Sequence, residues 1–127
     1  MVTEAPQKPA IDAAQLTRLL AMVGPGVAPG LLGLLHADLC TARQGLMLAT
    51  RRQDWAQIRA QSHIVMGLAG TMGATALQGL AKRLMDKMRS DPPNRPFLLA
   101  MISDMVAALD ATLAELSKAV PDLDRPA

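Results

Sequence analysis

His63 is the side chain in this sequence best placed to do chemistry. It stands in a stretch of mostly small and apolar residues, between Gln61 and Ala74, in which glycine recurs at positions 67, 70 and 73. Near neutral pH an imidazole nitrogen is largely a free base, and it can then act as a nucleophile. We therefore take His63 as the candidate reactive residue, and we expect the surrounding elements to hold it at the protein surface.

Helical geometry places His63 away from the apolar side of its own segment. Because an α-helix turns by about 100° per residue, Ile58, Val65, Leu68 and Met72 lie roughly 140° to 180° from His63 and mark the side that faces the core. His63 itself should project into solvent among small side chains. Within about 60° of it lie Arg52, Ala56, Arg59, Ala60, Met66, Gly67 and Gly70.

Two glycines share the face of His63. A glycine inside a helix costs roughly 1 kcal/mol relative to alanine, so Gly67 and Gly70 indicate that something approaches the backbone closely. Close approach by a partner protein is one interpretation. Tight packing against a neighbouring helix of the same chain is the alternative, and the sequence leaves both open.

Other chemistries find little support. His36 and Cys40 lie one helical turn apart but have no third ligand nearby, so they fall short of a zinc site. The glycines after His63 follow no strand and precede no Gly-Lys-Ser/Thr, which excludes a phosphate-binding loop. No Ser/His/Asp set and no pair of carboxylates can be argued, and no metal site is expected.

Composition favours an all-α protein of one domain. The chain has 127 residues, of which 50% are hydrophobic and only 2% aromatic, and Leu, Ala and Met favour helices over strands. The formal charge of +2 is dispersed rather than clustered, so nucleic-acid binding is not expected. The lone Cys40 excludes an internal disulfide and fits a reducing compartment.

Two stretches without charged residues invite comparison with membrane spans. Leu19–Ala37 is broken by glycine and proline, and Ala60–Ala81 carries several polar residues and glycines, whereas a spanning helix needs about 20 predominantly apolar residues. The first residues lack the basic-then-apolar order of a signal peptide. We therefore expect a cytoplasmic protein that does not insert into a membrane.

Apolar periodicity and helix breakers divide the chain into helices. Residues 1–10 predict a disordered lead-in, Ile11–Val23 a short helix, and Pro29 to Thr50 or Arg51 a long helix. Asp54 should cap the next helix, which carries His63 and ends at Gly73.

The second half follows the same rules. Thr75 should cap the fourth helix, which ends before the Ser90–Pro96 linker. The last helix should place Phe97 on its apolar stripe and end before Pro121, leaving 120–127 as a loose tail. The expected fold is all-α, an up-down four-helix bundle with a short additional N-terminal helix, over residues 11–119.

These residues resemble the histidine-containing phosphotransfer (HPt) domain family. That family carries the motif His-x-x-Lys-Gly-x-x-x-x-x-Gly inside a four-helix bundle, and here His63, Gly67 and Gly73 occupy the matching positions. The preceding pair Asp54-Trp55 resembles the usual lead into that helix, and the resemblance covers residues 11 to 119. The family lysine is replaced by Met66.

The resemblance implies roles for further residues. Without the motif lysine, the cation that stabilises a phosphoryl group would come from Arg59, Lys82 or Arg89. The family's acidic or amide side chain near the histidine falls on Met85 in our register, and Gln78 or Asp86 could take that role. A partner would dock on Ala56, Ala60, Met66, Gly67 and Gly70.

The function implied is that of a phosphocarrier without independent catalysis in a two-component phosphorelay. His63 would accept a phosphoryl group from the aspartate of a receiver domain, in a hybrid histidine kinase or a response regulator, and pass it to another receiver. The carrier needs no cofactor, because Mg²⁺ would sit on the receiver, and a monomer is expected. Two alternatives stay open: a degenerate adaptor that binds a receiver or kinase without being phosphorylated, and a helical structural or oligomerisation module.

Overall fold

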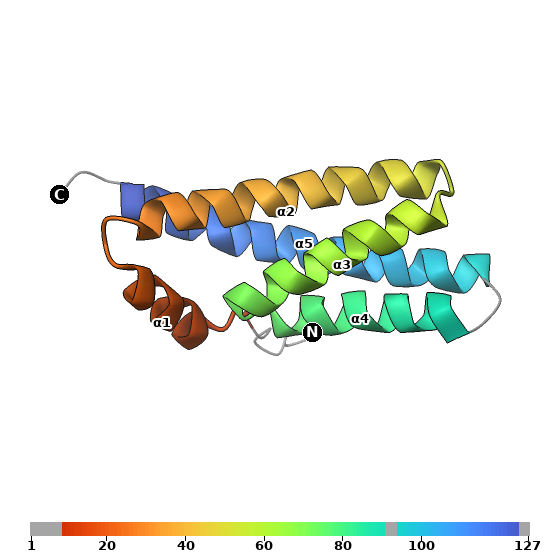
Figure 1. Cartoon of the computed structure of the whole chain (residues 1–127), viewed down its shortest axis with the longest axis horizontal. Coiled ribbons are helices and arrows are strands. Elements are labelled where there is room, and N and C mark those ends of the chain that lie inside the picture. The colour runs from red at the N-terminus through yellow and green to blue at the C-terminus, as the bar shows by residue number, and fades with distance from the viewer. Residues whose placement is uncertain (1–8, 91–93, 125–127) are drawn as a thin grey trace, which may run out of the picture.

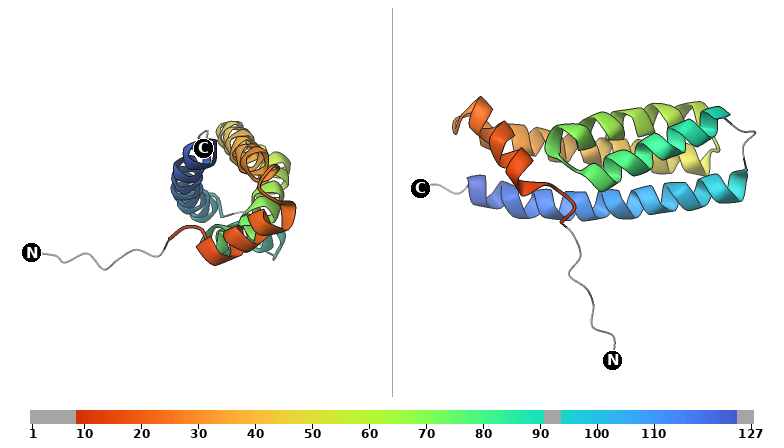
Figure 2. Two further views of the ribbon diagram at one scale, coloured as in Figure 1. Left: turned by 90° about the vertical axis from the view of Figure 1, so that its left-hand side faces the viewer. Right: turned by 90° about the horizontal axis from the view of Figure 1, so that it is seen from below.

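The computed structural model describes residues 9–90 and 94–124, and this part of the chain is helical (Figure 1). Four long helices form an up-down bundle in which α2 packs beside α3, α3 beside α4, α4 beside α5 and α5 beside α2 (Figures 1 and 2). The short α1 crosses the start of α2 and the end of α3. The predicted all-α bundle is confirmed. The helices are α1 (Ala13–Val23), α2 (Ala28–Arg51), α3 (Trp55–Met72), α4 (Thr75–Ser90) and α5 (Arg95–Asp124).

The helix that carries His63 is bounded by the two signals expected from the sequence. Asp54 caps its start, and its carboxylate accepts a hydrogen bond of 3.1 Å from the backbone N–H of Gln57. Gly73 ends it in the left-handed conformation with φ of 77°, and donates its N–H to the carbonyl of Ala69. Both predictions are confirmed, so α3 begins and ends where local chemistry places it.

The start of α4 differs from the prediction. Thr75 is the first helical residue rather than the cap, and the carbonyl of Ala74 accepts the N–H of Gln78. The Ala74 N–H donates to the Ala69 carbonyl at 2.8 Å. The chain therefore reverses directly after Gly73, and α4 begins one residue earlier than a Thr75 cap would allow.

The end of α5 also differs from the prediction. The helix continues through Pro121 to Asp124, so the expected loose tail at 120–127 is wrong as far as residue 124. Proline has a helical φ and removes only one backbone donor, which is tolerable in a last turn although costly in a helix interior. The disordered lead-in predicted at 1–10 lies outside the described residues up to position 8, as do 91–93 of the linker and 125–127.

The core is a continuous apolar cluster between the four long helices, and it differs from the expected stripe at the start of α5. Leu98 and Ile102 are buried, whereas Phe97 is 45% exposed. The ammonium of Lys87 lies 5.4 Å from the centre of the Phe97 ring, so this ring joins α4 to α5 from outside the core. The largest fully buried side chains are Leu32, Leu39, Leu46, Ile58, Met72, Leu77, Leu84, Leu98, Met105, Leu109, Leu116 and Val65.

The segment before α1 is fixed to the bundle by polar contacts. The Glu115 carboxylate on α5 accepts the backbone N–H groups of Ala10 and Ile11, the second at 3.0 Å. The Asp12 N–H donates to the Gly73 carbonyl at 2.9 Å, and the Ile11 side chain is buried in the core cluster. Ile11 was expected inside the first helix, but it precedes that helix and anchors it.

One helix in the described part of the chain is long and apolar enough to cross a membrane, and it is α5 between Arg95 and Ala119, with a mean hydropathy of 1.7. The core helix of a helical bundle has the same length and composition. Within the bundle, α5 packs between α2 and α4 and buries Met105 and Leu109 completely.

Candidate functional site

His63 lies on the solvent-facing side of α3. Its side chain is exposed, while Ile58 and Val65 on the opposite side of the same helix are completely buried. Among the described residues it has no hydrogen bond or ion pair. The imidazole is therefore accessible to an incoming group, as the face geometry predicts.

Gly67, one turn after His63, borders open space. A Cβ built at this position would meet no atom within 4 Å outside its own helix. No neighbouring helix of this chain therefore explains the glycine. The interpretation that Gly67 leaves room for a partner is consistent with the structure, and the alternative of tight internal packing is not.

Gly70 has a different explanation. A Cβ at Gly70 would stand 2.8 Å from Nε2 of Gln78 on α4, and Nε2 of Gln15 on α1 donates to the Gly70 carbonyl at 2.9 Å. Two glutamines of the same chain thus cover this glycine. Gly70 was expected at the docking surface, but here the alternative of close packing within the chain accounts for it.

The two alanines on the face of His63 are accessible to solvent, whereas Met66 is only partly accessible. Ala56 and Ala60 are exposed. Met66 is half-buried and packs against the core cluster, so its side chain contributes to the packing of the bundle. Beside His63, the buried Ser62 hydroxyl donates to the Ile58 carbonyl at 2.7 Å, which satisfies that polar group inside the core.

The candidate cations lie on two helices. Arg59 precedes His63 by one turn of α3 and is exposed, and Lys82 and Arg89 are exposed on α4. The contact of Gln78 with Gly70 sets the register between these helices. Since α3 and α4 run in opposite directions from their shared turn, Lys82 falls level with Met66 on α3.

The same register decides which α4 residue faces His63. His63 lies seven residues, or about 10 Å along the helix axis, from Gly70 and its neighbour Gln78. Met85, which is only 8% exposed, falls level with His63. This agrees with the register expected from the sequence and leaves Gln78 too far along the bundle to serve the imidazole directly.

A groove that was not expected from the sequence lies next to His63. It lies between α2 and α3, has a volume of about 290 Å³, and its walls include Thr41, Ile64 and Leu68. Ile64 is 46% exposed, and Leu34, one turn of α2 before the groove residue Asp38, is 57% exposed. An isoleucine directly after the candidate histidine was the available signal.

The second histidine, His36, makes contacts within the bundle. Its Nε2 lies 3.0 Å from the Ser117 hydroxyl on α5, and its Nδ1 lies 3.8 Å from the Cys40 sulfur. In the described part of the chain no group of three or more His, Cys, Asp or Glu side chains could hold a metal ion. His36 thus connects α2 to α5.

Comparison with known proteins identifies the family. A family model described as the Hpt domain matches residues 30–119, from the first turn of α2 into α5, and leaves α1 outside the match. No curated protein and no solved structure matches the chain. The match covers most of the chain and the whole His63 helix. The chain therefore belongs to the Hpt domain family, whose members are phosphotransfer modules of two-component signalling.

Proposed function

We propose that the protein is a phosphocarrier that holds a phosphoryl group on His63. The observation that carries the proposal is the exposed imidazole of His63 on α3, with open space at Gly67 one turn later. A receiver domain can approach such a side chain without displacing any helix of the bundle. The motif position of His63 within the Hpt domain match supports the same role.

The transfer is a displacement at phosphorus. A ring nitrogen of neutral His63 attacks the phosphorus of an aspartyl phosphate on the receiver; the nitrogen–phosphorus bond forms, and the bond to the aspartate oxygen breaks. The aspartate leaves as a carboxylate, and the phosphorylated ring retains its proton on the other nitrogen. The reverse displacement by a second receiver regenerates neutral His63. Mg²⁺ belongs to the receiver in this scheme.

The phosphoryl group brings up to two negative charges, which a nearby cation would stabilise. Met66 stands where the family has a lysine and cannot provide one. Lys82 is exposed, level with Met66 in the α3–α4 register, and its flexible chain suits a phosphate. Arg59 flanks His63 on α3 itself, and Arg89 lies farther along α4. We assign the stabilising charge to Lys82 and Arg59, with Arg89 as a secondary candidate.

The docking surface combines small and apolar residues around the histidine. Gly67, Ala60 and Ala56 give clearance, and the exposed Ile64 beside the α2–α3 groove gives apolar contact. Exposed apolar patches next to a polar reactive group are typical of protein interaction sites. The partner is a receiver domain of a hybrid histidine kinase or of a response regulator, and the carrier works as a cytoplasmic monomer without catalysis of its own.

The test is phosphoryl transfer from a phosphorylated receiver domain to the purified chain. We expect acid-labile, alkali-stable label on the wild-type protein and none on His63→Gln. His36→Gln is the matched control, because it removes the other histidine and should retain the label. Label that persists in His63→Gln, or that is lost only in His36→Gln, would overturn the assignment of His63.

A second candidate function is an adaptor that binds a receiver or kinase without being phosphorylated. It is favoured by Met66, which removes the motif cation. In that case receiver binding would be equally tight for the wild type and His63→Gln, and neither would carry label. Binding measured by titration calorimetry, alongside the labelling experiment, separates the two functions.

A further inference from the structure

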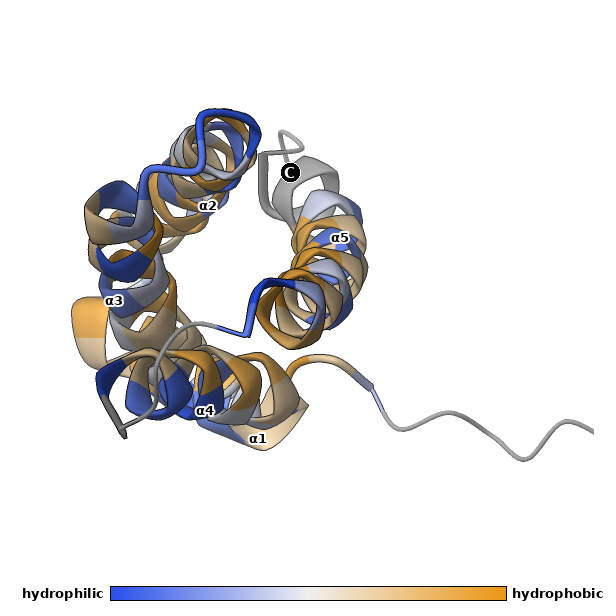
Figure 3. Ribbon diagram, turned by 90° about the vertical axis from the view of Figure 1, so that its right-hand side faces the viewer, coloured by the Kyte–Doolittle hydropathy of each residue, from blue (hydrophilic) through white to orange (hydrophobic). Residues whose placement is uncertain are grey.

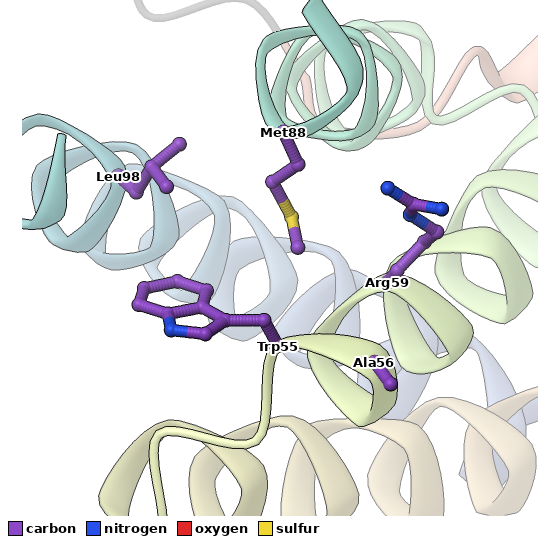
Figure 4. A pocket seen from close by; sticks show the side chains of 5 residues that line it. All are labelled: Trp55, Ala56, Arg59, Met88 and Leu98. Atoms are coloured by element: carbon purple, nitrogen blue, oxygen red, sulfur yellow. The ribbon is translucent and has the colours of Figure 1, made fainter. Parts of the chain in front are cut away.

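A pocket of about 300 Å³ opens at the end of the bundle, between the start of α3, the end of α4 and the start of α5 (Figure 4). The helices α3 and α4 diverge from their shared turn toward this end (Figure 1). The walls are formed by Trp55, Ala56 and Arg59 of α3, Met88 of α4 and Leu98 of α5.

The walls are apolar except for one cation. Trp55 and Met88 are half-buried and pack against the core cluster, and their side chains face each other across the pocket (Figure 4). Arg59 stands at the edge with its guanidinium directed toward α4. Ala56 belongs to the α3 wall, but its methyl group points away from Trp55 and Met88 (Figure 4). Pockets that bind small molecules have this composition, with an apolar body and one or two polar groups.

The charged side chains around the pocket favour a negatively charged ligand. Arg59 has no hydrogen bond or ion pair in the part of the chain that the structure describes. The α2–α3 turn and the start of α5 at this end of the bundle are hydrophilic (Figure 3). Further arginines at this end outnumber the acids Asp54 and Asp86, and their positive charges favour an anion. These arginines are Arg51 and Arg52 at the α2–α3 turn, Arg89 near the end of α4 and Arg95 at the start of α5.

The volume limits the size of the ligand. At about 30 Å³ for a water-sized group, 300 Å³ holds about ten non-hydrogen atoms. We propose that this pocket binds a small amphiphilic carboxylate, with its hydrocarbon part between Trp55 and Met88 and its carboxylate on Arg59. The guanidinium suits a carboxylate because it can donate two parallel hydrogen bonds.

The binding needs no phosphoryl chemistry, so it can be tested on the unmodified chain and is independent of the proposed function. Trp55 is the only tryptophan in the sequence, and it lies in the pocket wall. Its fluorescence therefore reports occupancy without a label. Octanoate, with about ten non-hydrogen atoms, is the probe, and 1-octanol is the uncharged comparison.

We expect octanoate to shift Trp55 fluorescence saturably and to bind about three- to fivefold more tightly than 1-octanol, as one exposed ion pair allows. Arg59→Gln should remove that difference, and Met88→Phe should weaken binding of both by narrowing the space opposite Trp55. Ala107→Leu, on the exposed side of α5, is the matched control and should bind octanoate as the wild type does. Titration calorimetry on the same variants checks the fluorescence. No saturable change, equal affinity for the acid and the alcohol, or unchanged affinities in Arg59→Gln and Met88→Phe would overturn the proposal.

Discussion

The side-chain amide of Gln78 lies against the backbone of Gly70, so close that a Cβ on Gly70 would stand 2.8 Å from Nε2. This contact sets the register of α4 on the His63 helix. The two glycines on the face of His63 therefore have different surroundings: Gly67 borders open space, and Gly70 is covered by Gln78. The two positions should therefore respond differently to the same substitution.

Gly67→Ala should stabilise the bundle and impair transfer. Alanine gains up to about 1 kcal/mol of helix propensity over glycine, and the structure leaves room for the added methyl group. The methyl would nevertheless stand where we propose that the receiver approaches. We expect a higher free energy of unfolding in urea with slower phosphoryl transfer.

Gly70→Ala is the matched comparison. The new methyl must displace the end of the Gln78 side chain, so the stability gain should be smaller than at Gly67. Transfer should stay close to the wild-type rate, since Gly70 is covered from within the chain. Equal effects of the two substitutions on transfer would contradict the separation of their roles.

Met66→Lys should strengthen the phosphorylated state. It restores the cation that the family places one turn from the histidine, and the lysine stem can pack where Met66 packs while its ammonium reaches solvent. We expect a longer phosphohistidine lifetime and a stability loss of about 1 kcal/mol. Met66→Gln, of similar length but uncharged, should show the stability loss without the longer lifetime.

Removal of the proposed cations tests where the compensating charge comes from. Lys82→Ala and Arg59→Ala should each shorten the phosphohistidine lifetime several-fold, and Arg89→Ala should have less effect. Lys82→Arg retains a positive charge and should recover most of the lifetime. Because all three side chains are exposed, folding should be unaffected, which thermal unfolding of each variant checks. Identical phosphohistidine lifetimes in all variants would contradict the assignment of these side chains as the source of the cation that Met66 lacks.

Glu115 should contribute to stability through the N-terminal segment. Its carboxylate accepts the N–H groups of Ala10 and Ile11, and hydrogen bonds to a charged group contribute about 1.5–3 kcal/mol. We expect Glu115→Ala to lower the free energy of unfolding by about 1–3 kcal/mol and to speed amide exchange at Ile11. Asp104→Ala, an exposed acid on the same helix, is the control and should change neither.

The ion pair between Arg43 and Asp110 should contribute much less. Arg43 Nε donates to Asp110 at 2.7 Å, but both side chains are partly exposed, and such pairs contribute about 0.2–1 kcal/mol. The hydrogen bond to Asp110 and its negative charge raise the pKa of Arg43. A raised pKa of a base adds stability below the unfolded-state pKa, and that stability is lost only as pH rises through the folded-state value. Arg43→Ala should therefore cost the same stability at pH 7 and pH 9.

Much of the fold follows from local signals in the sequence. Asp54 and Gly73 bound the His63 helix because a carboxylate cap and a left-handed glycine act on their own few residues. The exposure of His63 follows from helical phase alone. Signals of this kind need no knowledge of the partner helix.

The features that were missed depend on contacts between helices. Which of Phe97 and Leu98 is buried depends on how α5 rotates against α4, and Leu98 is buried in place of the expected Phe97. Gly70 was assigned to docking because the sequence cannot show that Gln15 and Gln78 cover it. The pocket beside Arg59 combines three helices, and no spacing within a single helix indicates it.

Arg59 belongs to both proposed sites, since it lines the pocket at the end of the bundle and precedes His63 by one turn. One guanidinium cannot satisfy a carboxylate and a phosphoryl group fully at the same time. Occupancy of the two sites should therefore be thermodynamically linked with negative sign. Reciprocity then requires that phosphorylation weaken octanoate binding by the same factor by which octanoate weakens the phosphorylated state. The two proposals together therefore imply that the stability of the phosphorylated state would depend on the concentration of a small amphiphilic carboxylate.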